Sequence, residues 1–407
     1  MTLPIERRTM LASLAASTLA AAVTGPALAQ AGPLRIGVLG DFSSVGRDNS
    51  GPGSLEAARM AVEEFGPIVL GRRVEVISAD HQQKPDIGLQ IARQWFDTDG
   101  VAAIADLPNT SVAIAVAELA RERQRIALIA GAGSSEITNK QCSPNTVHFG
   151  FDTYALAKVA TQPIIAEGGD SWFFIAADYT FGAQLEADAR KFIREAGGKV
   201  LGSVKLPMAT TDFSSALLQA QASGAKVVAL ANAGADTSNA LKQAAEFRLA
   251  QAGQRIVSLE LFVTDIDAAG LEVAQGAYFT TASYWDMTPR TRVWSQRFFD
   301  RVHLMPTMSH TSVYGSVLHY LKGVQAAGTD EAGKVMAAMR AIPIQDAFIE
   351  SATLRADGRV MREMYLARVK TPQESKKPWD YAAILKTVPA ESAFRPVSDS
   401  VCPLVRT

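Results

Sequence analysis

The chain has few of the residues and motifs on which most enzymes and metal sites depend. Of its 407 residues only two are cysteine and five are histidine, and no two histidines have the spacing of a zinc-binding helix. The sequence also contains no G-x-x-x-x-G-K-[ST] run, no complete G-x-G-x-x-G turn and no G-x-S-x-G elbow. We therefore expect no catalytic activity, no metal and no cofactor.

Neither sign of charge dominates, and long apolar runs are missing. The chain has 40 Lys and Arg against 41 Asp and Glu, with a formal net charge of −1. A near-neutral chain without a basic block is a poor candidate for binding nucleic acid. Beyond the first 30 residues or so, no stretch approaches the length of a transmembrane helix. The sequence predicts a soluble protein that is large enough for two domains.

The first 29 residues have the three parts of an export signal. Arg7 and Arg8 form a charged start, residues 10–23 are apolar, and Ala27-Leu28-Ala29 is a small-residue cleavage site. The apolar part is too short and too rich in Ala, Ser and Thr for a membrane span. We predict a signal peptide over 1–29 and a periplasmic protein. The arginine pair favours twin-arginine export, with an ordinary basic start as the alternative.

Both cysteines, Cys142 and Cys402, lie in the part of the chain that remains after export. An even number of cysteines in an exported protein favours a disulfide. Their surroundings, KQCSPN and DSVCPLV, are polar or rich in turn residues. We predict a bridge between them, with two buried free thiols as the alternative.

From residue 34 onward, short apolar strands alternate with amphipathic helices. Strand-like runs such as LRIGVLG, VAAIADL and RIVSLELF are separated by helical periods such as GSLEAARMAVEEFG. This alternation predicts parallel sheets covered by helices on both faces. Ten or more strands are too many for one open sheet, and the rhythm restarts near Asp152, so we expect two α/β lobes. Near the end, 348–370 reads as a hairpin that turns at Ala356-Asp357-Gly358.

Polar turns follow two of the predicted strands. Asn109, Thr110 and Ser111 follow VAAIADL, and Ser134 and Ser135 follow RIALIAG. Each cluster can simply cap a helix. Two such turns on successive strands of one sheet also predict a shared anion site, because the carboxyl ends of parallel strands hold ligands.

The chain resembles the type I periplasmic solute-binding proteins, and in particular their leucine/isoleucine/valine-binding branch. The segments IGVLGDFSSVGRDNSGPGSLEAARMAVEEFG, ADHQQKPDIGLQIARQWF and FIAADYTFGAQLE carry the resemblance, which extends over residues 34–370. It implies two doubly wound parallel-sheet lobes, joined by three crossings near 149–153, 280–285 and 351–358. It places 34–150 and 285–352 in the N-terminal lobe, 151–284 and 353–390 in the C-terminal lobe, and 391–407 in a surface tail.

The resemblance also implies roles for individual residues. Hydroxyl groups and backbone amides of two N-lobe turns would hold a carboxylate of the ligand, and an aromatic residue of the other lobe would close over it. An acid near LFVTDID would bind an ammonium group, and a hinge aromatic could form a wall of the pocket. The residues at these positions are Asn109, Thr110, Ser111, Ala132, Gly133, Ser134, Ser135, Tyr179, Phe181, Asp265, Tyr284 and Trp285.

The chain departs from the family pattern in the turn ANAGADT, which has small residues where amino-acid binders carry tyrosine. The ligand could therefore be an amino acid, a 2-oxo acid or an aromatic acid. We expect a monomer that delivers this small carboxylate to the membrane permease of an ABC importer. The alternatives are a sensor subunit with the same fold and, more remotely, an exported hydrolase. His81, in a polar segment after a strand, is expected to be structural or at the rim of the site.

Overall fold

The computed structural model describes Met1 and residues 32–405. The predicted signal peptide lies outside the described residues except for Met1. The folded unit begins at Pro33 and contains two lobes, each built around its own sheet.

The first lobe is built on a six-stranded sheet with the order β2-β3-β1-β4-β5-β6. All of its pairings are parallel except that of the short β2 with β3. Every residue of β4 is buried, as expected for a parallel strand covered on both faces. The strands are β1 (Leu34–Gly40), β2 (Ile68–Val69), β3 (Arg72–Asp80), β4 (Val101–Asp106), β5 (Ile126–Ile129) and β6 (Thr146–His148).

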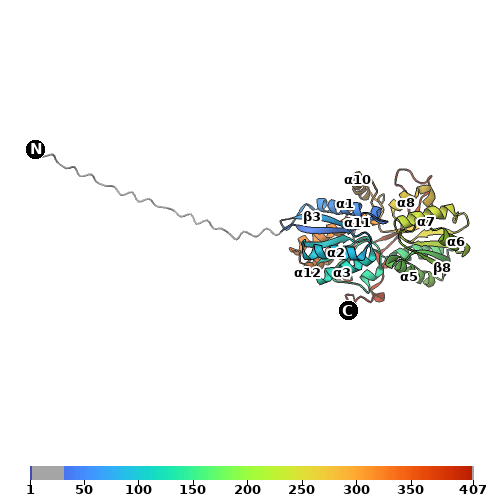
Figure 1. The fold of residues 1–407 in the computed structure, drawn as a ribbon, viewed down its shortest axis with the longest axis horizontal. Helices are drawn as coiled ribbons and strands as arrows, with labels where there is room; N and C mark the ends of the chain where they lie inside the picture. Colours follow the sequence, from blue (N-terminus) through green and yellow to red (C-terminus); the bar gives the residue numbers. More distant parts are fainter. Residues whose placement is uncertain (2–31, 406–407) are drawn as a thin grey trace. The chain divides into compact units, whose positions relative to one another are not determined.

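Helices cover both faces of this sheet (Figure 1). The core on one face comprises residues of α1, α10, α11 and α12, and the core on the other face comprises residues of α2 and α3. The late helices α10 to α12 thus return to the lobe in which the chain began. The helices are α1 (Gly51–Phe65), α2 (Pro85–Asp97), α3 (Thr110–Glu122), α10 (Pro289–Val302), α11 (Met308–Ala327) and α12 (Ala332–Ala341), with short 3₁₀ turns η1 (Arg47–Asn49) and η2 (Ser135–Thr138).

The second lobe has a seven-stranded sheet with the order β15-β14-β11-β10-β9-β7-β8. Strands β7 to β11 pair in parallel, whereas β14 and β15 are antiparallel additions at one edge. The strands are β7 (Ser171–Ala177), β8 (Lys199–Leu206), β9 (Val227–Ala231), β10 (Arg255–Ser258), β11 (Tyr278–Thr281), β14 (Met364–Val369) and β15 (Ala382–Val388).

Helices also cover both faces of the second sheet. The core on one face comprises residues of α4, α5 and α13, and the other comprises residues of α6 to α9. Asp152 caps α4 by accepting a hydrogen bond from the Ala155 N–H at 2.8 Å, so this helix begins directly after the chain leaves the first lobe. The helices are α4 (Thr153–Ala166), α5 (Thr180–Glu195), α6 (Ser214–Ala222), α7 (Ala235–Glu246), α8 (Val263–Ala269), α9 (Leu271–Ala274) and α13 (Ala390–Ala393).

Three segments cross between the lobes; the second overlaps the predicted range 280–285, and the third lies later in the chain than the predicted 351–358. The first crossing separates β6 from α4 at 149–152, and the second separates β11 from α10 at 282–288. The third is at 362–363, because the predicted hairpin, β12 (Thr353–Leu354) and β13 (Val360–Met361), contributes Leu354 and Val360 to the core of the first lobe. Its turn contains Gly358 with φ +89°, a conformation that glycine adopts without strain.

The end of the chain differs from the surface tail that we predicted for 391–407. Phe394 is fully buried in the core of the second lobe, and Cys402 is also fully buried. The structure joins Cys142 and Cys402 in a disulfide, with their Cα atoms 5.9 Å apart. The segment is held in place because Phe394 is large and apolar and because the disulfide fixes its far end.

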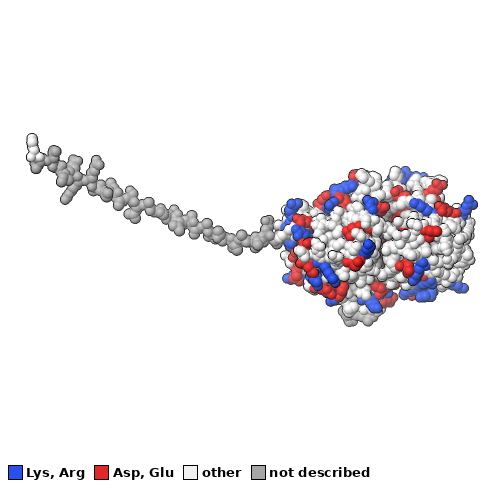
Figure 2. Space-filling view, in the orientation of Figure 1, with Lys and Arg blue, Asp and Glu red and all other residues white. Residues whose placement is uncertain are grey.

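Acidic and basic side chains are interspersed over the face of the folded unit seen in Figure 2. Many of them form ion pairs, such as Arg123 with Asp97 at 2.7 Å and Arg301 with Glu56 at 2.8 Å. None of the helices within residues 32–405 combines the length and the apolar character that crossing a bilayer requires.

Candidate functional site

A cleft lies between the lobes at the carboxyl ends of both parallel sheets. It contains about 550 Å³ of atom-free space, part of which is open to solvent. The lining residues come from turns after strands, from the first turns of the helices that follow, and from the start of α11. Open parallel sheets characteristically bind ligands at this edge.

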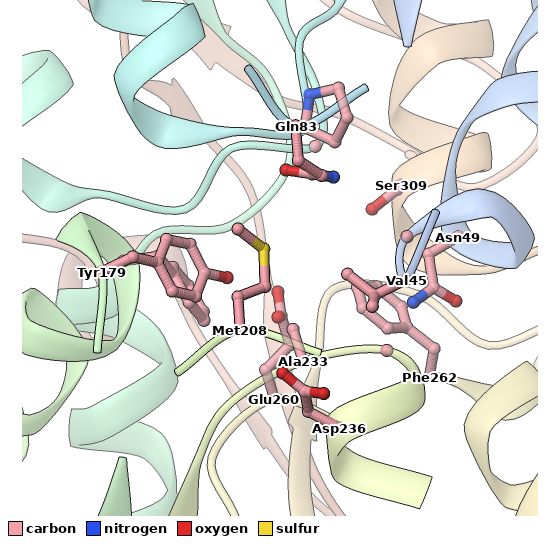
Figure 3. Close-up of a pocket in the computed structure, with 15 residues that line it drawn as sticks. Val45, Asn49, Gln83, Tyr179, Met208, Ala233, Asp236, Glu260, Phe262 and Ser309 are labelled. Carbon is pink, nitrogen blue, oxygen red and sulfur yellow. The ribbon is translucent and has the colours of Figure 1, made fainter. Parts of the chain in front are cut away.

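The first lobe presents neutral polar groups to the cleft (Figure 3). Gln83 follows β3 with φ +56°, and its side-chain amide is fixed at both ends. Its Nε2 donates to Asp41 at 2.8 Å, and its Oε1 accepts from Nδ2 of Asn109 at 2.8 Å. Asn49 and Ser309 lie across the cavity from Tyr179 in Figure 3. This wall can donate or accept hydrogen bonds without a net charge.

The second lobe presents aromatic and acidic side chains. Tyr179 and Phe181 come from the turn between β7 and α5, and Glu260 and Phe262 come from the turn between β10 and α8. In Figure 3 the Tyr179 hydroxyl and the Glu260 carboxylate point toward the same space, next to Met208. An apolar ligand group would therefore lie among rings, with an acid at its base.

Glu260 is a buried acidic residue that lines the cleft. Its exposed fraction is 3%, and no hydrogen bond or ion pair of its carboxylate is present among the described residues. Burial, with a smaller contribution from the charge of Asp265, raises the pKa of Glu260 well above its usual value. A cationic ligand group would favour the charged form of Glu260 and would supply the missing partner.

Asp236 is a second acid in the cleft wall; its Oδ2 has a partner in the protein, whereas its buried Oδ1 has none among the described residues. It is the second residue of α7, and its Oδ2 accepts a hydrogen bond from the Ala209 N–H at 3.1 Å. Burial raises its pKa to about 6, although the backbone amides of Ala209 and Thr210 act in the opposite direction. Asp236 therefore holds the loop that places Met208 in the cleft.

No lysine, arginine or histidine is among the described residues that line the cleft. Several helices begin at it instead, among them α5, α7 and α11. The N-terminus of a helix carries a partial positive charge and free N–H groups. An anionic ligand group would therefore be bound by dipoles and neutral donors rather than by a cationic side chain.

The lobes contact one another around the cleft. Thr264 of the second lobe donates a hydrogen bond to Asn49 of the first at 2.6 Å, and Ser111 contacts Thr180 at 3.0 Å. The Ala235 N–H also donates to the carbonyl oxygen of Val45 at 3.3 Å. The structure therefore represents a closed arrangement of the two lobes.

The first predicted anion turn lies beside the cleft, but its side chains are used within the protein. Asn109 caps α3 by accepting from the N–H groups of Ser111 and Val112, and it orients Gln83. Ser111 contacts the other lobe, and Thr110 is buried. Pro108 is the residue of this turn that lines the cleft.

The second predicted anion turn likewise does not present its hydroxyl groups to the cleft. Ser134 caps η2 by accepting from the Glu136 N–H, and Ser135 donates to Asp188 of α5 at 2.9 Å. Gly131, at the start of this turn, does line the cleft.

Ala132 and Gly133, which lie between Gly131 and Ser134, form hydrogen bonds through their carbonyl oxygens. The Ala132 oxygen contacts Nε2 of His148 at 2.7 Å, and the Gly133 oxygen accepts from the Thr153 N–H at 2.6 Å. A Cβ atom on Gly133 would lie 2.7 Å from the Phe181 ring, so this glycine permits the close approach of the other lobe.

Of the predicted aromatic residues, Tyr179 and Phe181 line the cleft, but the hinge pair does not. The Tyr284 hydroxyl and the Trp285 Nε1 both donate to the carbonyl oxygen of Trp379, at 2.8 and 2.9 Å. Both side chains belong to the core of the second lobe. They are buried hinge aromatics rather than a wall of the pocket.

Asp265 is also absent from the cleft wall. Its carboxylate accepts a hydrogen bond from the Phe262 N–H at 3.0 Å, which anchors the first turn of α8. Burial raises its pKa to about 7. His81 is fully buried, and its Nδ1 accepts from the Gln83 N–H at 3.0 Å, so it shapes the turn that carries Gln83.

Sequence reasoning missed Glu260, Gln83, Asn49 and Ser309. Glu260 was hidden because RIVSLELF reads as one strand, whereas β10 ends at Ser258 and places Glu260 in the turn. A charged residue inside an apolar run is a signal that could have revealed it, because a buried carboxylate needs a partner.

Comparison with known proteins gives a family for this architecture. Residues 33–377 match the family model described as periplasmic binding protein. A periplasmic binding protein from Burkholderia mallei is 42% identical, with a TM-score of 0.89 over 91% of this chain and 99% of that one. A branched chain amino acid ABC transporter periplasmic ligand-binding protein from Burkholderia xenovorans is 39% identical, with a TM-score of 0.83 over 92% of this chain and all of that one.

A Leu/Ile/Val-binding protein homolog from Brucella abortus is 27% identical over 229 residues, which are 54% of this chain. The match covers only 55% of the length of that relative. The chain therefore belongs to the periplasmic binding protein family.

Proposed function

We propose that the protein is the extracytoplasmic solute-binding component of an ABC importer and that it captures a small amino acid between its lobes. The observation that carries this proposal is Glu260. Its carboxylate faces the cleft, is buried, and has no partner among the described residues. An α-ammonium group supplies the charge and the hydrogen bonds that this carboxylate needs.

The other end of the ligand would be a carboxylate on the first lobe. Gly131 lines the cleft, and no hydrogen bond among the described residues uses the N–H groups of Ala132, Gly133 or Ser134. These amides could bind an anion together with the neutral side chain of Gln83. The turn that the sequence predicted as an anion site would thus bind the ligand carboxylate through its backbone N–H groups rather than through its serine hydroxyl groups.

The family relationship supports transport over catalysis. Named relatives are an ABC transporter ligand-binding protein and a Leu/Ile/Val-binding homolog. Closure would exclude water and present a defined surface to the permease, as in other hinge-bending proteins. We propose a periplasmic monomer exported by the twin-arginine route, with a ligand sensor as the alternative role.

The test compares leucine with 4-methyl-2-oxopentanoate, which has the same skeleton but no ammonium group. Calorimetry on the parent should show tighter binding of leucine. Glu260→Gln should weaken leucine roughly 10- to 100-fold and the oxo acid far less, because a hydrogen bond to a charged group contributes about 1.5–3 kcal/mol. Since Glu260 must be charged to bind ammonium, leucine affinity should also rise with pH.

Asp265→Asn is the matched control, because it neutralises a buried acid on the same segment that does not line the cleft. It should not reduce the preference for leucine, because removal of the Asp265 charge can only favour the charged form of Glu260. Equal weakening of both ligands by Glu260→Gln would refute the assignment of the ammonium site. If neither compound binds, mass spectrometry of the ligand released from the denatured protein decides, and a ligand without a cationic group would contradict the proposal.

A further inference from the structure

The last part of the chain connects the two lobes a fourth time. We define the C-terminal strap as residues 394–402. Its first residue, Phe394, is fully buried in the core of the second lobe, next to α13. Its last residue, Cys402, is bonded to Cys142, which follows η2 in the first lobe. Ile137 of η2 belongs to the core of the first lobe, so the strap ends on a firmly packed segment.

The start of the strap packs on the hinge itself. The Arg359 guanidinium lies over the Phe394 ring at 4.6 Å from its centroid. The same guanidinium donates to the carbonyl oxygens of Gly150 and Phe151, at 3.0 and 3.2 Å. Phe394 therefore contacts a side chain that already joins the hairpin β12–β13 to the first crossing.

The middle of the strap contacts both lobes. Arg395 donates to Oγ of Ser135 at 3.2 Å in the first lobe, and its guanidinium lies over the Tyr154 ring of α4 at 4.9 Å. Ser135 donates in turn to Asp188 of α5 at 2.9 Å, and Thr153 donates to the same carboxylate at 2.6 Å. Arg395 thus completes a polar network between the lobes.

The end of the strap is anchored to the first lobe by more than the disulfide. The Val401 N–H donates to Oδ1 of Asn139 at 2.8 Å, and Asn139 is itself buried. Separation of the lobes at this edge must break the contacts of Arg395 or unwind the 3₁₀ turn η3 (Val397–Asp399). The disulfide prevents the alternative, in which the end of the strap simply leaves the first lobe.

We propose that the C-terminal strap is a covalent restraint on lobe opening and that reduction of the Cys142–Cys402 disulfide releases it. The strap is formed in the closed arrangement, so it favours closure over opening. Loss of the bond lets the strap follow the second lobe, which raises the open population and accelerates ligand release. The strap restrains the movement of the lobes and does not contact the ligand, so its effect on opening does not depend on which ligand the cleft binds.

The experiment uses the ligand-free mature protein, so it needs no identified ligand. Oxidised protein, protein reduced with a phosphine, and the double variant Cys142→Ser plus Cys402→Ser are compared by small-angle scattering and hydrogen exchange. We expect a larger radius of gyration without the bond. We also expect roughly tenfold faster exchange in peptides that contain Ala235, whose N–H bonds Val45 across the cleft.

Arg395→Gln, with the disulfide intact, should produce a smaller shift in the same direction. An unchanged radius of gyration together with unchanged exchange near Ala235 would overturn the proposal. Global loss of secondary structure on reduction, seen by circular dichroism in both the reduced protein and the double variant, would also overturn it. The Cys142–Cys402 disulfide would then stabilise the whole fold rather than restrain the opening of the lobes.

Discussion

Substitution of Arg359 by methionine should destabilise the protein more than most single changes. The Arg359 side chain is fully buried, and it donates to Gly150, Phe151 and Val360 and pairs with Asp152 at 3.5 Å. Methionine retains much of the aliphatic volume but removes the donor to these carbonyl groups and the ion-pair partner of Asp152, which keeps only its hydrogen bond from the Ala155 N–H. Removal of one member of a buried ion pair costs about 3–5 kcal/mol, so we expect a loss of that size in the free energy of unfolding near neutral pH.

The loss in the free energy of unfolding of Arg359→Met should depend on pH, because Asp152 titrates differently in the variant. Burial already raises the pKa of Asp152, while the positive charge of Arg359 lowers it. In Arg359→Met the lowering influence is gone, so the folded-state pKa rises further above the unfolded value. A raised folded pKa gives a contribution to stability that is complete below the unfolded pKa and is lost as pH rises through the folded pKa. The deficit of the variant should therefore be smaller at pH 5 than at pH 8.

Urea unfolding at the two pH values, followed by tryptophan fluorescence and circular dichroism, measures this deficit. Arg359→Lys keeps the charge but not the planar donors, and it should lose an intermediate amount. Adding Asp152→Asn to Arg359→Met should recover part of the loss and remove its pH dependence. A deficit below about 1 kcal/mol at pH 8, or the same deficit at both pH values, would refute the reasoning.

Two further predictions concern closure and a structural acid. Gly234 has φ +61°, and a Cβ there would lie 2.5 Å from the carbonyl oxygen of Val45 in the other lobe. Gly234→Ala should weaken leucine binding about tenfold or more in calorimetry, with a smaller loss in ligand-free melting temperature from backbone strain; unchanged affinity would show that closure does not require this contact. Asp265 has a pKa raised by burial to about 7, so its contribution to stability is lost as pH rises toward that value. The melting temperature of Asp265→Asn relative to the parent should therefore rise between pH 5 and pH 8, and a constant difference would contradict a buried, titrating Asp265.

Local patterns in the sequence were sufficient to predict the architecture. The alternation of apolar strands with amphipathic helices predicted two α/β lobes, and the structure and the family match confirm this fold class. Hydrophobic period and turn chemistry act over a few residues, so they can be read without knowledge of the fold. The hairpin turn at Gly358 and the polar residues at strand ends belong to the same kind of information.

Which side chains face the cleft was decided only by the tertiary structure. Ser134 and Ser135 stand at a strand end as predicted, yet one caps η2 and the other bonds a helix of the opposite lobe. Glu260 faces the cleft because β10 ends two residues before it, a boundary that the apolar run did not reveal. Arg359 donates hydrogen bonds to the carbonyl groups of Phe151 and Gly150, which lie 208 and 209 residues earlier in the chain. The direction of a side chain at the end of a strand depends on packing between distant segments, and the local sequence contains no signal for that packing.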